Sequence, residues 1–281
     1  EHIRARGHEV TSYGTKAAGD GSRHVAALAP DSLDRLIVVG GDGTLHDVVN
    51  ARPAPLPWPV GILPAGTANL VARELGIAPN LAPQRSADML IEAQGWPVNL
   101  MEVEHRGESP YYAVANVGVG IDGRIVRTIS DLRAGSAQSG GYLHWIRPIW
   151  RSIWKGGLGP LSVTVDGERT WRATSCVVQN AYSYGGVFRL APAAALDGDT
   201  LQVCLFRNRT SRDLLRMVAQ GLTRTIHRAR DIRILPARQV ELSAQGRAPT
   251  QVDGDPAGPT DIRIRLRRGA LTLLRQVPVP A

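Results

Sequence analysis

The chain has 281 residues, of which 43% are hydrophobic and 21% charged, and its formal net charge is +8. This length and composition suffice for one large core or two moderate ones, which excludes a disordered protein. No run approaches the roughly 20 apolar residues of a membrane-spanning helix.

The positive charge lies in the second half of the chain. Residues 1–97 carry 8 basic and 10 acidic side chains, whereas residues 98–281 carry 25 and 15. An anionic partner would be attracted there. It could be a membrane surface, a nucleic acid or no specific partner, and nucleic acid ranks last because no recognition helix or stacking-aromatic motif occurs. Cys176 and Cys204 lie in apolar runs and are predicted to be buried free thiols.

Apolar strands alternate with helical stretches in the first part of the chain. We predict strands at 9–15, 35–39 and 58–63 and helices at 22–28, 45–50 and 68–75. This alternation is typical of an α/β domain with a parallel sheet.

The predicted secondary structure changes near residue 98, after which strands predominate. They are predicted at 99–104, 111–117, 161–165, 170–179, 201–206, 231–235, 240–243, 262–266 and 271–274, with helices at 141–155 and 211–223. The predicted organisation is an α/β domain at 1–97 followed by a β-rich domain at 98–281.

Two strand-to-helix turns carry the chemistry. Strand 36–39 leads into Gly40-Gly41-Asp42-Gly43-Thr44, and strand 60–63 leads into Pro64-Ala65-Gly66-Thr67-Ala68-Asn69. Glycine lets the backbone approach a phosphate closely, and a following helix start offers free N–H groups. Consecutive strand-loop-helix units place both loops at the carboxyl edge of one sheet, where ligands bind in open α/β folds.

These two loops, read through Leu63, resemble the signature of the diacylglycerol kinase catalytic domain family, which includes bacterial lipid kinases and sphingosine kinases. The first loop is shared with NAD kinases and phosphofructokinases, and the second distinguishes the family. Three further segments match the family pattern: 116–122, 185–192 and 252–255. The resemblance implies a nucleotide-binding α/β domain and a β-sandwich-like lipid-substrate domain, with the active site between them.

The resemblance also implies roles for single residues. Asp42 and Asp122 would organise Mg²⁺, and Asp253, aided by Asp255, would be the general base, although in sphingosine kinases the aspartate matching Asp42 has that role. ATP would be held by residues of the two loops, namely Gly40, Gly41, Gly43, Thr44, Gly66, Thr67 and Asn69. Phosphoryl transfer needs alignment, charge neutralisation and a carboxylate that takes the hydroxyl proton.

Several aspartates have a simpler interpretation, because Asp-Gly is a strong turn signal. Asp253-Gly254 could be only a hairpin turn, Asp122-Gly123 has the same ambiguity, and Asp166-Gly167 is predicted to be only a turn.

The chain departs from the family pattern at four places. Leu70 replaces an aspartate after Asn69, Asp255 replaces a glutamate, and the segment 196–201 differs from a structural-metal loop, which leaves a metal at Asp197 and Asp199 in doubt. Family members begin with a strand and an N-P-x-x-G loop, whereas this chain opens in what resembles the end of the helix after that loop. We expect the given sequence to be truncated.

The segment 141–155 combines aromatic and basic faces. Trp150 and Trp154 lie four residues apart, and the basic residues occupy another face. Such a helix suits the boundary between water and an anionic membrane, although packing on the β domain explains the pattern equally well.

The leading prediction is a cytoplasmic kinase, peripheral to the inner face of the membrane, that moves the γ-phosphate of ATP onto a lipid alcohol such as diacylglycerol. Two alternatives stay open: a catalytically degenerate relative that binds anionic lipid, and an NAD kinase-like enzyme.

Overall fold

The structure is a computed structural model, and it describes residues 1–52, 56–66, 68–78, 81–135, 159–185, 189–207, 220, 229, 231–258 and 260–276. The chain forms two compact units. Unit 1 comprises Glu1–Leu100 with Arg267–Ala281, and unit 2 comprises Met101–Leu266. The sequence predicts a single boundary near residue 98. In the structure the C-terminal segment from Arg267 also belongs to unit 1, which was not predicted.

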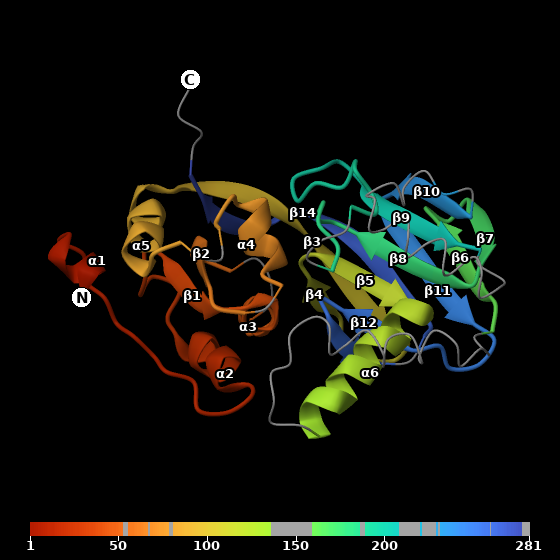
Figure 1. The fold of residues 1–281 in the computed structure, drawn as a ribbon, viewed down its shortest axis with the longest axis horizontal. Helices are drawn as coiled ribbons and strands as arrows, with labels where there is room; N and C mark the ends of the chain where they lie inside the picture. The colour runs from red at the N-terminus through yellow and green to blue at the C-terminus, as the bar shows by residue number, and fades with distance from the viewer. Residues whose placement is uncertain are drawn as a thin grey trace. The chain divides into compact units, whose positions relative to one another are not determined.

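Unit 1 contains a parallel strand pair. Strand β1 (Leu36–Gly40) pairs with β2 (Val60–Pro64) in register from Leu36 opposite Val60 to Gly40 opposite Pro64, and Val60 also pairs with Leu273 of β14. Helix α3 (Asp42–Val49) follows β1, and α4 (Leu70–Glu74) follows β2 after a short loop. Both helices therefore begin at the carboxyl edge of the pair (Figure 1).

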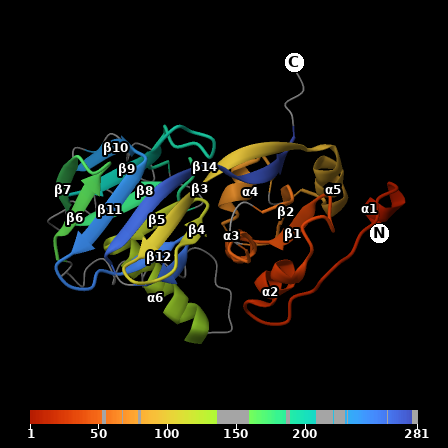
Figure 2. The same ribbon diagram turned by 180° about the vertical axis from the view of Figure 1, so that it is seen from behind.

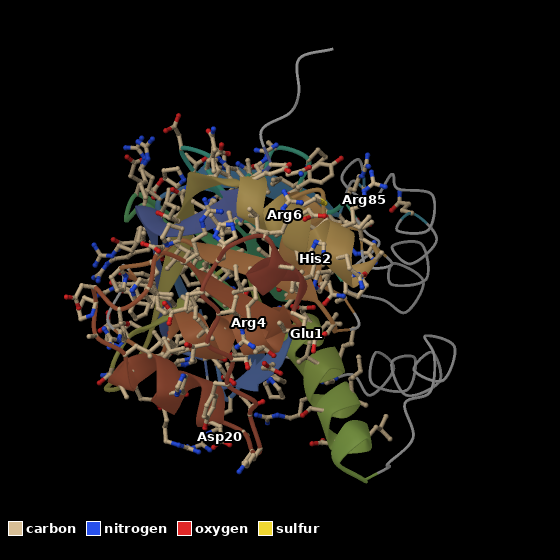
Figure 3. The ribbon with its side chains drawn as sticks, turned by 90° about the vertical axis from the view of Figure 1, so that its left-hand side faces the viewer. Glu1, His2, Arg4, Arg6, Asp20 and Arg85 are labelled. Atoms are coloured by element: carbon tan, nitrogen blue, oxygen red, sulfur yellow. The ribbon has the colours of Figure 1, made fainter. Side chains whose placement is uncertain are left out.

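Two further helices contact each other in unit 1. Helix α5 (Pro83–Glu92) packs on β2, and its Leu90 joins Leu274 in a small apolar core. Helix α1 (His2–Ala5) lies against α5, where His2 Nε2 and Arg6 Nη1 lie 2.8 and 2.9 Å from Asp88 Oδ1 (Figure 3). Helix α2 (Asp20–Ala27) contacts α3.

Unit 2 is a β-sandwich. One sheet is antiparallel, with the strand order β10-β9-β8-β5-β12-β13. The other contains β7, β6, β11 and the first part of β14, with β3 beside β14 and β4 beside β3 (Figures 1 and 2). The bounds are β3 Gln94–His105, β4 Tyr111–Ala113, β5 Asn116–Val119, β6 Leu161–Val165, β7 Arg169–Ala173, β8 Ser175–Gln179, β9 Leu201–Phe206, β10 Ile232–Ala237, β11 Gln239–Ala244, β12 Thr250–Val252, β13 Asp255–Ala257 and β14 Ile262–Arg275.

The core of unit 2 lies between these sheets. Val117, Val178 and Val203 from one sheet join Val163 and Ile264 from the other, and all are fully buried. Apolar side chains on alternating positions of facing strands are what a sandwich core requires. Helix α6 (Ile121–Gly135) packs on β5, β8, β12 and β13.

The predicted fold class, an α/β domain with a parallel sheet followed by a β-sandwich-like domain, is confirmed. Individual elements differ. Residues 9–15 form no strand, and the predicted strands at 111–117 and 170–179 each break into two strands that belong to different sheets. Residues 262–275 form one strand instead of two, and α5 and α6 were not predicted. A helix end at the start of the chain and a hairpin turn at Asp253-Gly254 were expected, and α1 and the β12–β13 hairpin lie at these places. The helices predicted at 141–155 and 211–223 lie outside the described residues, apart from Gln220.

Among the described residues, no helix has the length and apolar character needed to span a bilayer.

Candidate active site

The two glycine-rich loops adjoin each other in unit 1. Gly40 ends β1 opposite Pro64, and the Ala65 N–H donates to the Gly40 carbonyl oxygen at 2.9 Å. Parallel pairing brings both loops to the same sheet edge, as the sequence predicts. One local boundary differs, because α3 begins at Asp42 and not at Leu45, so that Gly43 and Thr44 belong to its first turn.

The loops touch through two glycines. A Cβ atom added to Gly66 would lie 2.6 Å from the Cα atom of Gly41, and one added to Gly41 would lie 3.0 Å from the Cα atom of Gly66. A Cβ atom on Gly40 would lie 2.5 Å from the Thr44 hydroxyl oxygen. Gly41 and Gly66 are therefore required for close packing of one loop on the other, and Gly40 is required for packing within the first loop.

Asp42 links the first loop to the helix after the second. Its Oδ2 accepts a hydrogen bond from the Leu70 N–H at 2.9 Å, and its Oδ1 accepts one from the Val71 N–H at 3.2 Å. A carboxylate on the first N–H groups of a helix is electrostatically favourable. Asp42 therefore holds the two loops together across β1 and β2.

Asn69 shapes the second loop. It is buried, has a left-handed backbone with φ 47°, and precedes α4. Its Oδ1 accepts from the Gly66 N–H at 3.0 Å, and its Nδ2 donates to the Gly66 carbonyl at 2.7 Å. Asparagine tolerates this conformation and bonds its own loop. Thr67, the remaining predicted nucleotide contact, lies outside the described residues.

Asp253 lies in unit 2 at the turn of the β12–β13 hairpin. Asp253 and Gly254 both have positive φ, 50° and 92°, as a tight two-residue hairpin requires. The carboxylate is buried and accepts three backbone hydrogen bonds, from the N–H groups of Val114 at 2.7 Å, Ala115 at 2.8 Å and Asn116 at 3.0 Å. Asp253 therefore lies in a hairpin turn, and its side chain is fixed in place.

Asp122 lies in the first turn of α6 and is also buried. The Tyr184 hydroxyl donates to its Oδ1, and Gln251 Nε2 donates to its Oδ2 at 2.7 Å. Burial raises the pKa of Asp122 above 3.8, while these two hydrogen bonds lower it. Burial, the charge of Asp122 and their hydrogen bond together raise the pKa of Tyr184 well above its ordinary value.

Asp42 and Asp122, the predicted Mg²⁺ ligands, are both held by hydrogen bonds within the protein. Both carboxylate oxygens of Asp42 and of Asp122 already accept hydrogen bonds from protein donors. The described part of the chain contains no group of three or more His, Cys, Asp or Glu side chains suited to a metal ion.

Asp255 differs from Asp253, because it is exposed at the start of β13.

Sequence reasoning missed three residues that surround the aspartates: Asn116, Tyr184 and Gln251. Asn116 lies in a recognised motif and Gln251 lies two residues before Asp253, but neither pattern indicates which side chains would meet.

A surface groove of about 470 Å³ in unit 2 is separate from these residues. Most of its lining residues are polar, and none of the predicted site residues lines it.

Comparisons with known proteins match both parts of the chain. The family model "Diacylglycerol kinase catalytic domain" matches residues 1–103, and "YegS C-terminal NAD kinase beta sandwich-like domain" matches residues 115–275. This chain belongs to the diacylglycerol kinase family. Membership makes it a lipid kinase, a phosphotransferase, at the level of the family, and a kinase family implies use of ATP.

Several known proteins are similar to this chain over most of their length. "Probable lipid kinase YegS-like" from Chromohalobacter salexigens is 27% identical over 281 residues, covering 96% of this chain and 85% of the relative. The diacylglycerol kinase of Bacillus subtilis is 25% identical over 257 residues, covering 90% and 81%. A diacylglycerol kinase structure from Bacillus anthracis str. Sterne has the same fold, with a TM-score of 0.68, 20% identity and coverage of 95% and 85%.

Proposed function

We propose that this chain transfers the γ-phosphate of ATP to the hydroxyl of diacylglycerol or a related lipid alcohol. The observation that carries the proposal is the direct contact between two glycine-rich loops at one sheet edge, where Gly41 and Gly66 approach as only glycines can. Together with the family match, this contact supports a site for a polyphosphate.

The ATP phosphates are assigned to the paired loops. The first turn of α3 offers backbone N–H groups at the positive end of the helix, beside Gly40 and Gly41. The second loop contributes Gly66 and Asn69, and we include Thr67 from the sequence pattern. In this assignment Asp42 keeps the two loops in register through its hydrogen bonds to Leu70 and Val71.

The proton acceptor for the lipid hydroxyl is assigned to Asp255. Both carboxylate oxygens of Asp253 accept hydrogen bonds, from three backbone N–H groups in all, which suits a side chain that fixes the turn. Asp255 follows it by two residues, is exposed, and can approach a substrate hydroxyl. A base must come within hydrogen-bond reach of the proton that it takes.

The partner surface is assigned to an anionic membrane, at which the enzyme meets its lipid from the cytoplasmic side. The support is the excess of basic over acidic side chains in residues 98–281, 25 against 15. Each basic group near an anionic bilayer contributes about 1 kcal/mol to attraction.

The test is transfer of ³²P from γ-labelled ATP in a buffer containing Mg²⁺. Mixed micelles would present dioleoylglycerol, ceramide or a long-chain monoacylglycerol, and the extracted lipids would be separated by thin-layer chromatography. The proposal expects a labelled phospholipid from at least one lipid alcohol. A folded protein that binds ATP but labels none of them would refute lipid kinase activity, and one that binds lipid vesicles but ignores ATP would support the degenerate alternative.

A further inference from the structure

Gln251 lies at the centre of a buried hydrogen-bond network in unit 2. It belongs to β12 and is 1% exposed. Its Nε2 donates to Asn116 Oδ1 and to Asp122 Oδ2, both at 2.7 Å, and its Oε1 accepts from the Gly254 N–H at 2.8 Å. This orientation of the amide uses both N–H donors and the carbonyl oxygen, so the side chain is fully satisfied.

The three partners of Gln251 come from three elements. Asn116 begins β5, Asp122 lies in the first turn of α6, and Gly254 is in the turn between β12 and β13. One side chain therefore ties the hairpin turn to a strand and to a helix. Fully satisfied buried networks of this kind hold their members rigidly.

Gly118 leaves the space in which this network forms. A Cβ atom at this position would lie 1.6 Å from Asp122 Oδ2 and 2.8 Å from Gln251 Nε2. Glycine on β5 is therefore a condition for the hydrogen bond between Asp122 and Gln251. The packing explains two members of the 116–122 motif, Gly118 and Asp122, without giving either a contact to substrate.

The turn that precedes Asp255 is anchored on both sides. Asp253 is held by three backbone N–H groups, and its own N–H donates to the Asn116 carbonyl at 2.9 Å. Gly254 is held by Gln251 at 2.8 Å. The direction in which β13 leaves the turn, and with it the position of Asp255, depends on both anchors.

We infer that Gln251 is a positioning residue for phosphoryl transfer, which holds the Asp253-Gly254-Asp255 turn in place from Asp122 and Asn116. The inference rests on the proposed function, because it gives Asp255 the role of proton acceptor. Misplacement of a reacting group by about 1 Å lowers turnover by about 10²-fold. Displacement of the Gln251 side chain from Asp122 and Asn116 shifts the turn that it holds and leaves the nucleotide loops of unit 1 unchanged.

The decisive variant is Gln251→Glu. The size of the side chain is kept, but a carboxylate replaces the two N–H donors and faces the oxygens of Asp122 and Asn116. We expect kcat for the lipid substrate to fall at least about 10-fold, while the KM for ATP stays within about twofold. Gln239→Glu, the same change on β11 outside the network, should keep wild-type kcat.

A second, compensating substitution distinguishes the loss of positioning from a general loss of structure. In the double variant Asp122→Asn/Gln251→Glu the amide and the carboxylate exchange places, so their hydrogen bond can form again, and Asn116 can turn its amide to donate. We expect kcat to recover to within about threefold of wild type. Wild-type kcat in Gln251→Glu, or no recovery in a double variant with the wild-type melting temperature, would overturn the inference.

A folding failure is also informative. If Gln251→Glu does not fold, Gln251→Asn, which shortens the side chain and keeps the amide, is measured instead, with the same expected loss of kcat. Failure of both variants to fold would show a structural role alone and overturn the inference. An inactive wild-type protein would instead count against the proposed function, so the two failures can be told apart.

Discussion

Replacing Gly66 by alanine should separate the two loops. The added Cβ atom would lie 2.6 Å from the Cα atom of Gly41 and 2.8 Å from Asn69 Oδ1, and ordinary contacts begin at 3.4 Å. Both neighbours are fixed: Gly41 is backbone, and the Asn69 oxygen accepts the Gly66 N–H. The loops must move apart by roughly 0.8 Å, and overpacking of this kind costs about 1–3 kcal/mol of stability.

The same displacement should reach the phosphates. A shift approaching 1 Å in a group that positions substrate lowers turnover by about 10²-fold. We therefore expect Gly66→Ala to weaken ATP binding and to reduce lipid phosphorylation by about this factor, measured by ³²P transfer at several ATP concentrations, with thermal unfolding in parallel.

Gly14→Ala is the matched control, because a Cβ atom at Gly14 meets nothing within 4 Å. It should leave turnover and melting temperature at the wild-type values. Wild-type ATP affinity and turnover in Gly66→Ala would refute the idea that close contact of the two loops forms the nucleotide site.

Four other predictions concern unit 2. Asp255→Asn should keep the wild-type melting temperature and lower kcat by about 10²-fold. Asp253→Asn should lower the free energy of unfolding, measured in urea, by about 1–3 kcal/mol, because an amide oxygen cannot accept hydrogen bonds from all three N–H groups. Asp166→Asn is the control for Asp253, since Asp166 also begins an Asp-Gly turn and bonds two N–H groups but is exposed; equal losses would contradict the special role of burial. Burial raises the pKa of Asp122 above 3.8, so its contribution to stability is greatest below pH 3.8 and is lost as pH rises through the raised pKa. Relative to wild type, Asp122→Asn should therefore gain stability as pH rises above 3.8, and a difference that does not change with pH would contradict this. Burial likewise raises the pKa of both cysteine thiols, so iodoacetamide should label neither in the folded protein and both after unfolding.

The nucleotide loops were predictable because their information is local. A strand, glycines at the points of closest approach and a following helix are all contiguous in sequence, so Gly40–Thr44 and Pro64–Asn69 could be placed at one edge. The partner of Asp42 could not be predicted, since it is the backbone of residues 70 and 71 in the next unit of the pattern.

Helix α6 was missed because Asp122-Gly123 resembles a turn. In the structure Gly123 lies in the helix and not in a turn, and an added Cβ atom would lie 2.3 Å from the Pro249 carbonyl oxygen. The glycine allows the helix to pack closely on the chain before β12. A glycine that serves packing and a glycine that serves a turn are indistinguishable from sequence.

Strand pairing was the other source of error. Residues 111–117 and 170–179 have continuous apolar character, yet the chain changes sheet at residues 114–115 and at Thr174. Apolar periodicity reports burial and does not report which sheet buries a residue. Residues 9–15 have the pattern of a strand, but pairing with a neighbour decides whether a strand forms.

The roles of the aspartates depended on contacts between distant parts of the chain. Asp253 meets Val114–Asn116 across more than 130 positions, and Gln251 meets Asp122 across 129. No single sequence reveals such pairs, so the three backbone hydrogen bonds of Asp253 could not be predicted.

The most direct test of the central claim, that the two loops together form one nucleotide site, is equilibrium binding of ATP to the unaltered protein. Isothermal titration calorimetry with MgATP should give saturable binding of one ATP per chain that excess ADP abolishes. Absence of saturable binding, or ATP binding that ADP does not compete for, would contradict the claim.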